Sequence, residues 1–104
     1  MAGRAFDGLL AEYLLEARER IARLEEVLLD LPERPEPERR ELLDDARREL
    51  HTLKGNAGMM GLKETQALAH TLEDAVDALD PGDPDVASIL VGLDELRKLL
   101  QVGA

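Results

Sequence analysis

The chain has 104 residues, of which 44% are hydrophobic, so we expect one domain over residues 1–104 and no separate catalytic domain. Its formal net charge of −10 argues against a nucleic-acid partner, because phosphate backbones are bound by concentrated Lys and Arg. The lack of cysteine excludes disulfides, and apolar runs of a few residues indicate neither a secretory nor a membrane segment. We therefore expect a cytoplasmic protein that does not contact the membrane.

Composition and the spacing of apolar residues both predict helices packed on helices. Only 2% of the residues are aromatic and 35% are charged, and apolar residues recur every three or four positions. A proline-rich segment at 32–37, a left-handed cap at Gly61, and Asp83 as N-cap before Pro84 separate the helices. We predict an all-α, antiparallel up-down four-helix bundle with helices at about 5–31, 37–60, 63–80 and 84–102.

The second predicted helix carries an unusual outward face. At 100° per residue, His51, Lys54, Gly55 and Gly58 fall in one narrow arc with Arg47, opposite the apolar side of the helix. A glycine inside a helix costs about 1 kcal/mol relative to alanine, and on this side it gains nothing from the core. We interpret the two glycines as a bare surface on which a partner docks beside an exposed imidazole.

Phosphoryl transfer to histidine needs an exposed neutral ring nitrogen, a group that holds the proton of the other nitrogen, and nearby positive charge. His51 is the candidate nucleophile, Lys54 lies one turn further along the same face, and Glu73 on the next helix is positioned to accept a hydrogen bond from the ring. His70, one turn from Glu73, and Arg47 are accessory candidates. Positive charge is also concentrated in this part of the chain, which predicts a cationic patch around the histidine. Seven of the 13 Lys and Arg residues lie there: Arg34, Arg39, Arg40, Arg47, Arg48, Lys54 and Lys63.

Two segments, LHTLKGNAGMMGL at 50–62 and HTLED at 70–74, resemble the paired motifs of histidine phosphotransfer domains. Nearly the whole chain is similar to the N-terminal phosphotransfer domain of chemotaxis-type, CheA-like histidine kinases. The resemblance implies a role for each residue that matches the motifs. His51 is the phosphorylated residue, Lys54 the charge stabiliser, Glu73 the hydrogen-bond partner, His70 an accessory residue, and Gly55 and Gly58 the docking surface.

This resemblance also implies a phosphorelay intermediate rather than an autonomous enzyme. Such a domain accepts a phosphoryl group from the ATP-binding domain of a histidine kinase or from a phospho-receiver, and passes it to an aspartate of a response-regulator receiver domain. It binds no cofactor of its own, because Mg and ATP, or aspartyl phosphate, are supplied by the partner domains. The chain then corresponds either to an excised kinase domain or to a stand-alone phosphocarrier.

Two other classes of function remain open at this stage. One is a helical adaptor that works without phosphorylation, since exposed charged residues commonly do no more than solvate a helix. The other is a metal-binding bundle, suggested by the order His70-x-x-Glu73. Two histidines and no repeated Glu-x-x-His motif make a four-helix metal centre a poor fit, so we predict no metal site.

Overall fold

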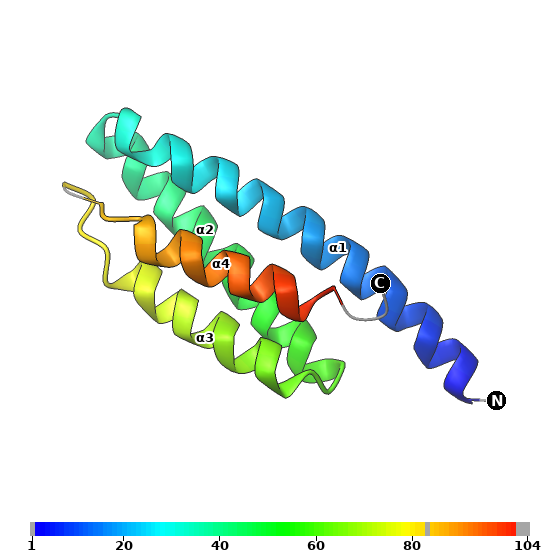
Figure 1. Ribbon diagram of the computed structural model, residues 1–104. Coiled ribbons are helices and arrows are strands. Elements are labelled where there is room, and N and C mark those ends of the chain that lie inside the picture. Colours follow the sequence, from blue (N-terminus) through cyan, green and yellow to red (C-terminus); the bar gives the residue numbers. More distant parts are fainter. Residues whose placement is uncertain (1, 83, 102–104) are drawn as a thin grey trace.

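The computed structural model describes residues 2–82 and 84–101, with side chains described from Asp7 onward. Successive helices run in opposite directions, and α1 and α3 each pack against both α2 and α4 (Figure 1). Strands are absent from the described residues, which confirms the predicted all-α four-helix bundle. The elements are α1 (Ala2–Asp30), the short 3-10 turn η1 (Leu31–Glu33), α2 (Glu36–Met59), α3 (Lys63–Asp77) and α4 (Ala87–Leu99).

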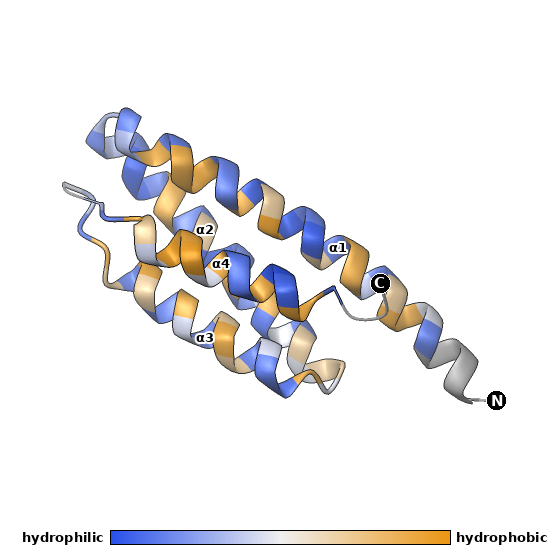
Figure 2. Cartoon of the chain, viewed as in Figure 1, coloured by the Kyte–Doolittle hydropathy of each residue, from blue (hydrophilic) through white to orange (hydrophobic). Residues whose placement is uncertain are grey.

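The apolar stripes of the four helices meet in one core (Figure 2). Burial of each large aliphatic side chain stabilises the fold by about 1.5–3 kcal/mol. Leu9 belongs to the apolar spacing of α1 but is 58% exposed, because the first turns of α1 extend beyond the ends of the other helices (Figure 1). Phe6 belongs to the same apolar spacing, and its side chain lies outside the described ones. The largest fully buried side chains are Ile21, Leu24, Leu28, Leu31, Leu50, Leu53, Ile89, Leu93, Leu96 and Leu100.

Several predicted helix ends are wrong by a few residues. Helix α1 begins at Ala2 rather than near residue 5, and η1 follows it because Pro32 favours a tight turn over a further α-helical turn. Helix α3 ends at Asp77 rather than near residue 80. There the Leu79 amide bonds to the Val76 carbonyl, one residue closer than in an α-helix, before the chain reaches Asp80 and Pro81.

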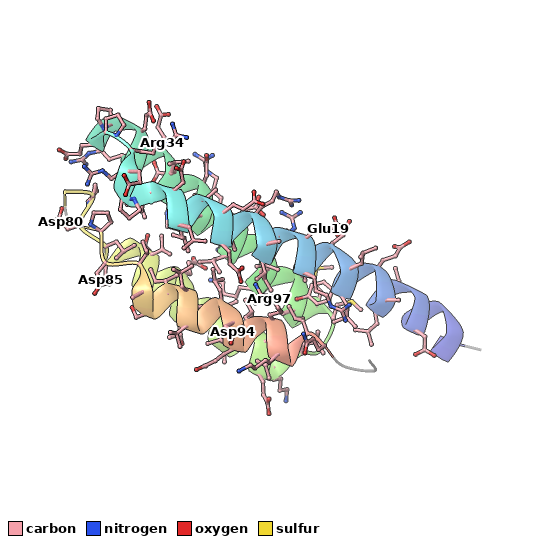
Figure 3. The ribbon with its side chains drawn as sticks, turned by 45° about the horizontal axis from the view of Figure 1, so that its top comes forward. Glu19, Arg34, Asp80, Asp85, Asp94 and Arg97 are labelled. Atoms are coloured by element: carbon pink, nitrogen blue, oxygen red, sulfur yellow. The ribbon has the colours of Figure 1, made fainter. Side chains whose placement is uncertain are left out.

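Helix α4 spans Ala87–Leu99 and is shorter than the predicted 84–102 at both ends. Pro84 does not open the helix, and Asp83, its predicted N-cap, lies outside the described residues. The carboxylate of Asp85 instead accepts a hydrogen bond from the Ala87 amide at 3.2 Å, at the end of the loop that also holds Asp80 (Figure 3). A side chain two residues upstream therefore satisfies a free amide of the first turn.

The turn between α2 and α3 sets the relation of the two helices. Gly61 has φ +74°, as predicted for a left-handed cap, and its amide bonds to the Gly58 carbonyl. The Leu62 amide bonds to the Ala57 carbonyl at 2.9 Å, which completes a Schellman motif. Because this turn is so short, α3 returns directly along α2 and faces it over most of its length.

Arginine side chains tie α1 to the helices beside it. Arg18 donates two hydrogen bonds, of 2.8 and 3.2 Å, to the Leu100 carbonyl at the end of α4. Arg97 of α4 pairs with Glu25 of α1 and with Asp94 (Figure 3). Within the part of the chain that the structure describes, every helix is too short or too polar to cross a bilayer.

Candidate functional site

The candidate site lies on the seam between α2 and α3. Each step of four residues along α2 is matched by a step of four back along α3, so Arg47 faces Asp77 and His51 faces Glu73. The Arg47 Nε atom lies 3.3 Å from Asp77 Oδ1, and the His51 Nδ1 atom lies 3.2 Å from Glu73 Oε1. The antiparallel register thus brings together two residues that are 22 positions apart in sequence.

Glu73 links the histidine to the lysine predicted beside it. Its Oε1 atom contacts His51, while its Oε2 atom lies 2.9 Å from Lys54 Nζ. Burial of the carboxylate would raise the pKa of Glu73, but its contacts with Lys54 and His51 outweigh that effect, and the net pKa lies below the ordinary value. Glu73 is therefore ionised at neutral pH although its side chain is only 15% exposed.

The state of His51 follows from this partner. An ionised carboxylate can only accept hydrogen bonds, so the Nδ1 atom of His51 carries the proton that it donates to Glu73. In the neutral ring, the Nε2 atom then keeps a free lone pair. The side chain is 69% exposed, compared with 22% for Lys54. The site thus holds an accessible ring nitrogen with a free lone pair in a fixed tautomer.

An open hollow of about 400 Å³ adjoins the histidine, lined by Arg47, Arg48, His51, Thr52 and Glu73. Thr52 had no role in the sequence-based interpretation, and Arg48 entered it only as one of the seven cations of the predicted patch. Arg48 lies one helical turn before His51, so its place on the same side of α2 was recognisable from the helical period. Thr52 carries no comparable signal, because a threonine next to a histidine is not distinctive by itself.

The predicted cationic patch around His51 is smaller than expected. The predicted cluster extends back to Arg34, and its nearest member in the first turns of α2, Arg40, is already roughly 16 Å along the helix axis from His51. Arg40 pairs with Glu36, and Arg34 pairs with Asp30. Of the seven cations predicted to surround the histidine, only Arg47 and Arg48 line the hollow. The cations are close together in the sequence but not in space, because a helix spreads its residues over its length.

His70 forms no hydrogen bond or ion pair with Glu73. Its Nε2 atom lies 3.5 Å from Asp74 Oδ2, one turn further along α3, and its side chain is 59% exposed. The structure joins His51, Lys54 and Glu73, but His70, which we expected as an accessory member of this group, pairs with Asp74 instead. In residues 2–82 and 84–101, no group of three or more His, Cys, Asp or Glu side chains is arranged to hold a metal ion.

The two glycines of the predicted docking surface differ in their surroundings. A Cβ atom built on Gly55 would meet no atom of the described residues within 4 Å, so the helix backbone there is open. A Cβ atom on Gly58 would lie 2.5 Å from Gln66 Nε2, the far end of a flexible side chain on α3. The bare surface is thus widest at Gly55 and is partly covered at Gly58.

Comparison with known proteins agrees with this geometry. The chain is 35% identical to the chemotaxis protein CheA of Halobacterium salinarum over 90% of its own length and 14% of the relative. It is 33% identical to the CheA protein of Bacillus subtilis, covering 86% of this chain and 14% of that protein. It is 29% identical to the sensor histidine kinase CheAY of Helicobacter pylori, covering 90% of this chain. The chain thus spans about one seventh of the first two relatives.

No solved structure matches the chain significantly. The sequence model of the Hpt domain, in contrast, matches residues 8–102. This range contains all four helices except the start of α1, and it contains both halves of the seam that pairs His51 with Glu73. The chain therefore belongs to the Hpt domain family.

Proposed function

We propose that His51 accepts a phosphoryl group and passes it to a second protein, so that the chain acts as a phosphorelay intermediate. The observation that carries this proposal is the contact between His51 Nδ1 and Glu73 Oε1, which leaves Nε2 as the free nitrogen of an exposed ring. Membership of the Hpt domain family and similarity to CheA proteins support it.

In the proposed reaction, the lone pair of His51 Nε2 attacks the phosphorus atom of the donor. A nitrogen–phosphorus bond forms, the bond from phosphorus to the leaving oxygen breaks, and that oxygen keeps the electron pair. The Nδ1 proton stays in place, and Glu73 balances the positive charge that develops on the ring. In the second step an aspartate carboxylate of the acceptor attacks the same phosphorus atom, and Nε2 recovers its lone pair.

The proposed donor is the catalytic domain of a histidine kinase with Mg and ATP, or a phosphorylated receiver domain. The proposed acceptor is the receiver domain of a response regulator. One relative is named a sensor histidine kinase, and this chain covers 12% of that protein. We therefore assign kinase activity to other domains and only the carrier step to this chain, with no cofactor bound by the chain itself.

The test is incubation of the chain with labelled ATP and a CheA-type kinase core that lacks its own phosphotransfer domain. Wild type is expected to gain one label that is stable to alkali and labile to acid. His51→Gln should take up none, whereas His70→Gln should be labelled, because His70 pairs with Asp74 and not with Glu73. A fully labelled His51→Gln variant would overturn the proposal. An unlabelled wild type would favour the adaptor function.

A further inference from the structure

The cations around the hollow differ in how strongly they are already engaged. Lys54 lies 2.9 Å from Glu73 Oε2, and its positive charge is thereby balanced. Arg47 lies 3.3 Å from the carboxylate of Asp77 across the seam. Arg48 contacts only Asp45 among the described acidic residues, at 3.4 Å, within one turn of the same helix. Its side chain is 74% exposed.

A phosphoryl group on Nε2 would bring about two negative charges into this hollow. The charge of Lys54 is already shared with the mostly buried Glu73, which needs that counter-charge, so less of it is left for a phosphoryl group. Arg48 has no such conflict, because an exposed ion pair within one helix turn contributes little free energy. On electrostatic grounds, Arg48 is the cation of the hollow that is freest to turn toward a new anion.

We propose that Arg48 binds the oxygens of the phosphoryl group carried by His51. This inference rests on the proposed function and adds a phosphoryl-binding residue to it. Arg48 lies three residues before His51, so the two share one side of α2, and helical side chains lean toward the N-terminal turn. The imidazole therefore leans toward Arg48, and both line the same hollow. The planar guanidinium matches two phosphoryl oxygens at once, which a lysine cannot do.

The first experiment compares wild type, Arg48→Gln, Arg48→Lys and the control Arg40→Gln. The control removes the same charge from the same helix, about 12 Å further along its axis. Each protein is phosphorylated by the kinase core and, separately, by phosphoramidate, a small donor that needs no docking surface. We expect the initial rate to fall about tenfold in Arg48→Gln with both donors, as for the loss of one charged hydrogen bond. The rate of Arg48→Lys should lie between those of wild type and Arg48→Gln, and the rate of Arg40→Gln should match wild type.

A second variant should change the rate in the opposite direction. Asp45→Asn removes the carboxylate that competes for Arg48, so we expect it to speed phosphorylation by phosphoramidate. In the double variant with Arg48→Gln this gain in rate should disappear, because the arginine that Asp45→Asn would release is no longer there. A gain that persists in the double variant would show that Asp45 acts through general charge repulsion, which would overturn the role of Arg48.

The phosphorylated forms give a readout that a structural role would not change. A guanidinium on the phosphoryl oxygens favours their ionised form. The midpoint of the phosphorus-31 NMR titration should therefore lie at higher pH in Arg48→Gln than in wild type or Arg40→Gln. If Arg48→Gln has the same titration midpoint and the same rates as wild type, the inference is disproved. The carrier function would still stand, because it depends only on the labelling of His51. If Arg48→Gln slows phosphorylation by the kinase core but not by phosphoramidate, Arg48 is a docking residue. That result would also disprove the inference.

Discussion

At the scale of single residues, Glu73 is the side chain on which the site depends most. It is contributed by α3, while both side chains that its carboxylate contacts come from α2, so one carboxylate fixes the histidine tautomer and balances the lysine. His51 in turn needs no burial to be held in place, because one oriented hydrogen bond defines its ring. The proposed nucleophile is thus exposed, while the carboxylate that orients its ring is largely protected from solvent.

Replacement of Glu73 by alanine should slow phosphorylation of His51 by roughly 10- to 100-fold without abolishing it. The carboxylate orients the ring and holds its proton, but it forms no bond to phosphorus. The rate is measured with the kinase core, and Glu64→Ala, an exposed glutamate in the first turn of α3, serves as the control. A wild-type rate in Glu73→Ala would mean that the contact with His51 has no part in transfer.

Replacement of Lys54 by methionine should raise the pKa of Glu73. Burial pushes that pKa upward and the contacts with Lys54 and His51 push it down, so removal of one contact leaves burial less opposed. The lowered pKa in wild type means that Glu73 contributes stability above its unfolded pKa of about 4.3. That contribution is lost as the pH falls through the lower, folded pKa.

Carbon-13 NMR titration of the Glu73 carboxyl group measures this shift, and urea unfolding at pH 7 measures its effect on stability. Lys54→Met should unfold at a lower urea concentration than wild type. The control, Lys63→Met, removes an exposed lysine at the start of α3 and should change neither quantity. If the Glu73 titration in Lys54→Met is the same as in wild type, the ion pair between the two residues does not exist in solution.

At the scale of helices, the amphipathic pattern of α2 predicted its inner and outer faces. On the apolar side, Met60 is only half-buried, and five residues are fully buried: Leu43, Ala46, Leu50, Leu53 and Ala57. His51, Lys54 and Gly55 lie on the other side. The same reasoning missed Gly92 of α4, which is buried against Leu72 of α3. A glycine in a helical pattern can mark either close packing against a neighbouring helix or a bare surface. Only the packing of α3 on α4 shows that Gly92 is of the first kind.

The helical glycines should therefore respond differently to alanine. Gly55→Ala should raise the free energy of unfolding by about 0.5–1 kcal/mol, because its Cβ meets no described atom and alanine favours helix. Gly58→Ala should raise the free energy of unfolding by less, because the side chain of Gln66 must move aside. Gly92→Ala should lower the free energy of unfolding by about 1–3 kcal/mol, because the added Cβ would overlap the buried side chain of Leu72.

Thermal and urea unfolding of the three variants test this order, with Gly92→Ala as the positive control for a packing glycine. Gly55→Gln adds the test of docking: it should melt near wild type yet transfer its phosphoryl group to a receiver more slowly. A Gly55→Ala variant as unstable as Gly92→Ala would show that Gly55 packs against something. A normal transfer rate in Gly55→Gln would remove the docking role.

At the scale of the whole molecule, the fold was predictable and the detailed pairing was only partly so. Apolar spacing and the glycine and proline breaks predict four helices, and short connections make neighbours antiparallel. The Schellman turn at Gly61 then sets the register that pairs His51 with Glu73. Which group an arginine meets on another part of the chain is not encoded in such patterns. Arg39, for example, donates to the Pro81 carbonyl, a contact made by loop geometry alone.

The bundle should carry the phosphoryl group without changing its own conformation. Leu50 and Leu53, on either side of His51 in sequence, are 0% and 1% exposed, whereas the histidine side chain is 69% exposed. A modification on this surface removes no apolar contact, so it should change the global stability by less than about 0.5 kcal/mol. Amides of the core helices exchange with solvent mainly through global unfolding, and their exchange rates should therefore change less than about threefold.

Hydrogen exchange of phosphorylated and unphosphorylated protein, followed by mass spectrometry, measures this directly. We expect slower exchange only near residues 47–55 of α2 and 70–77 of α3, where new contacts to the phosphoryl group form. His51→Gln treated with the same kinase core controls for effects of the incubation. A tenfold or larger change in α1 or α4 would contradict the expectation. It would mean that phosphorylation of His51 switches the packing of the bundle, so that a partner recognises a new conformation and not only a new charge on an unchanged surface.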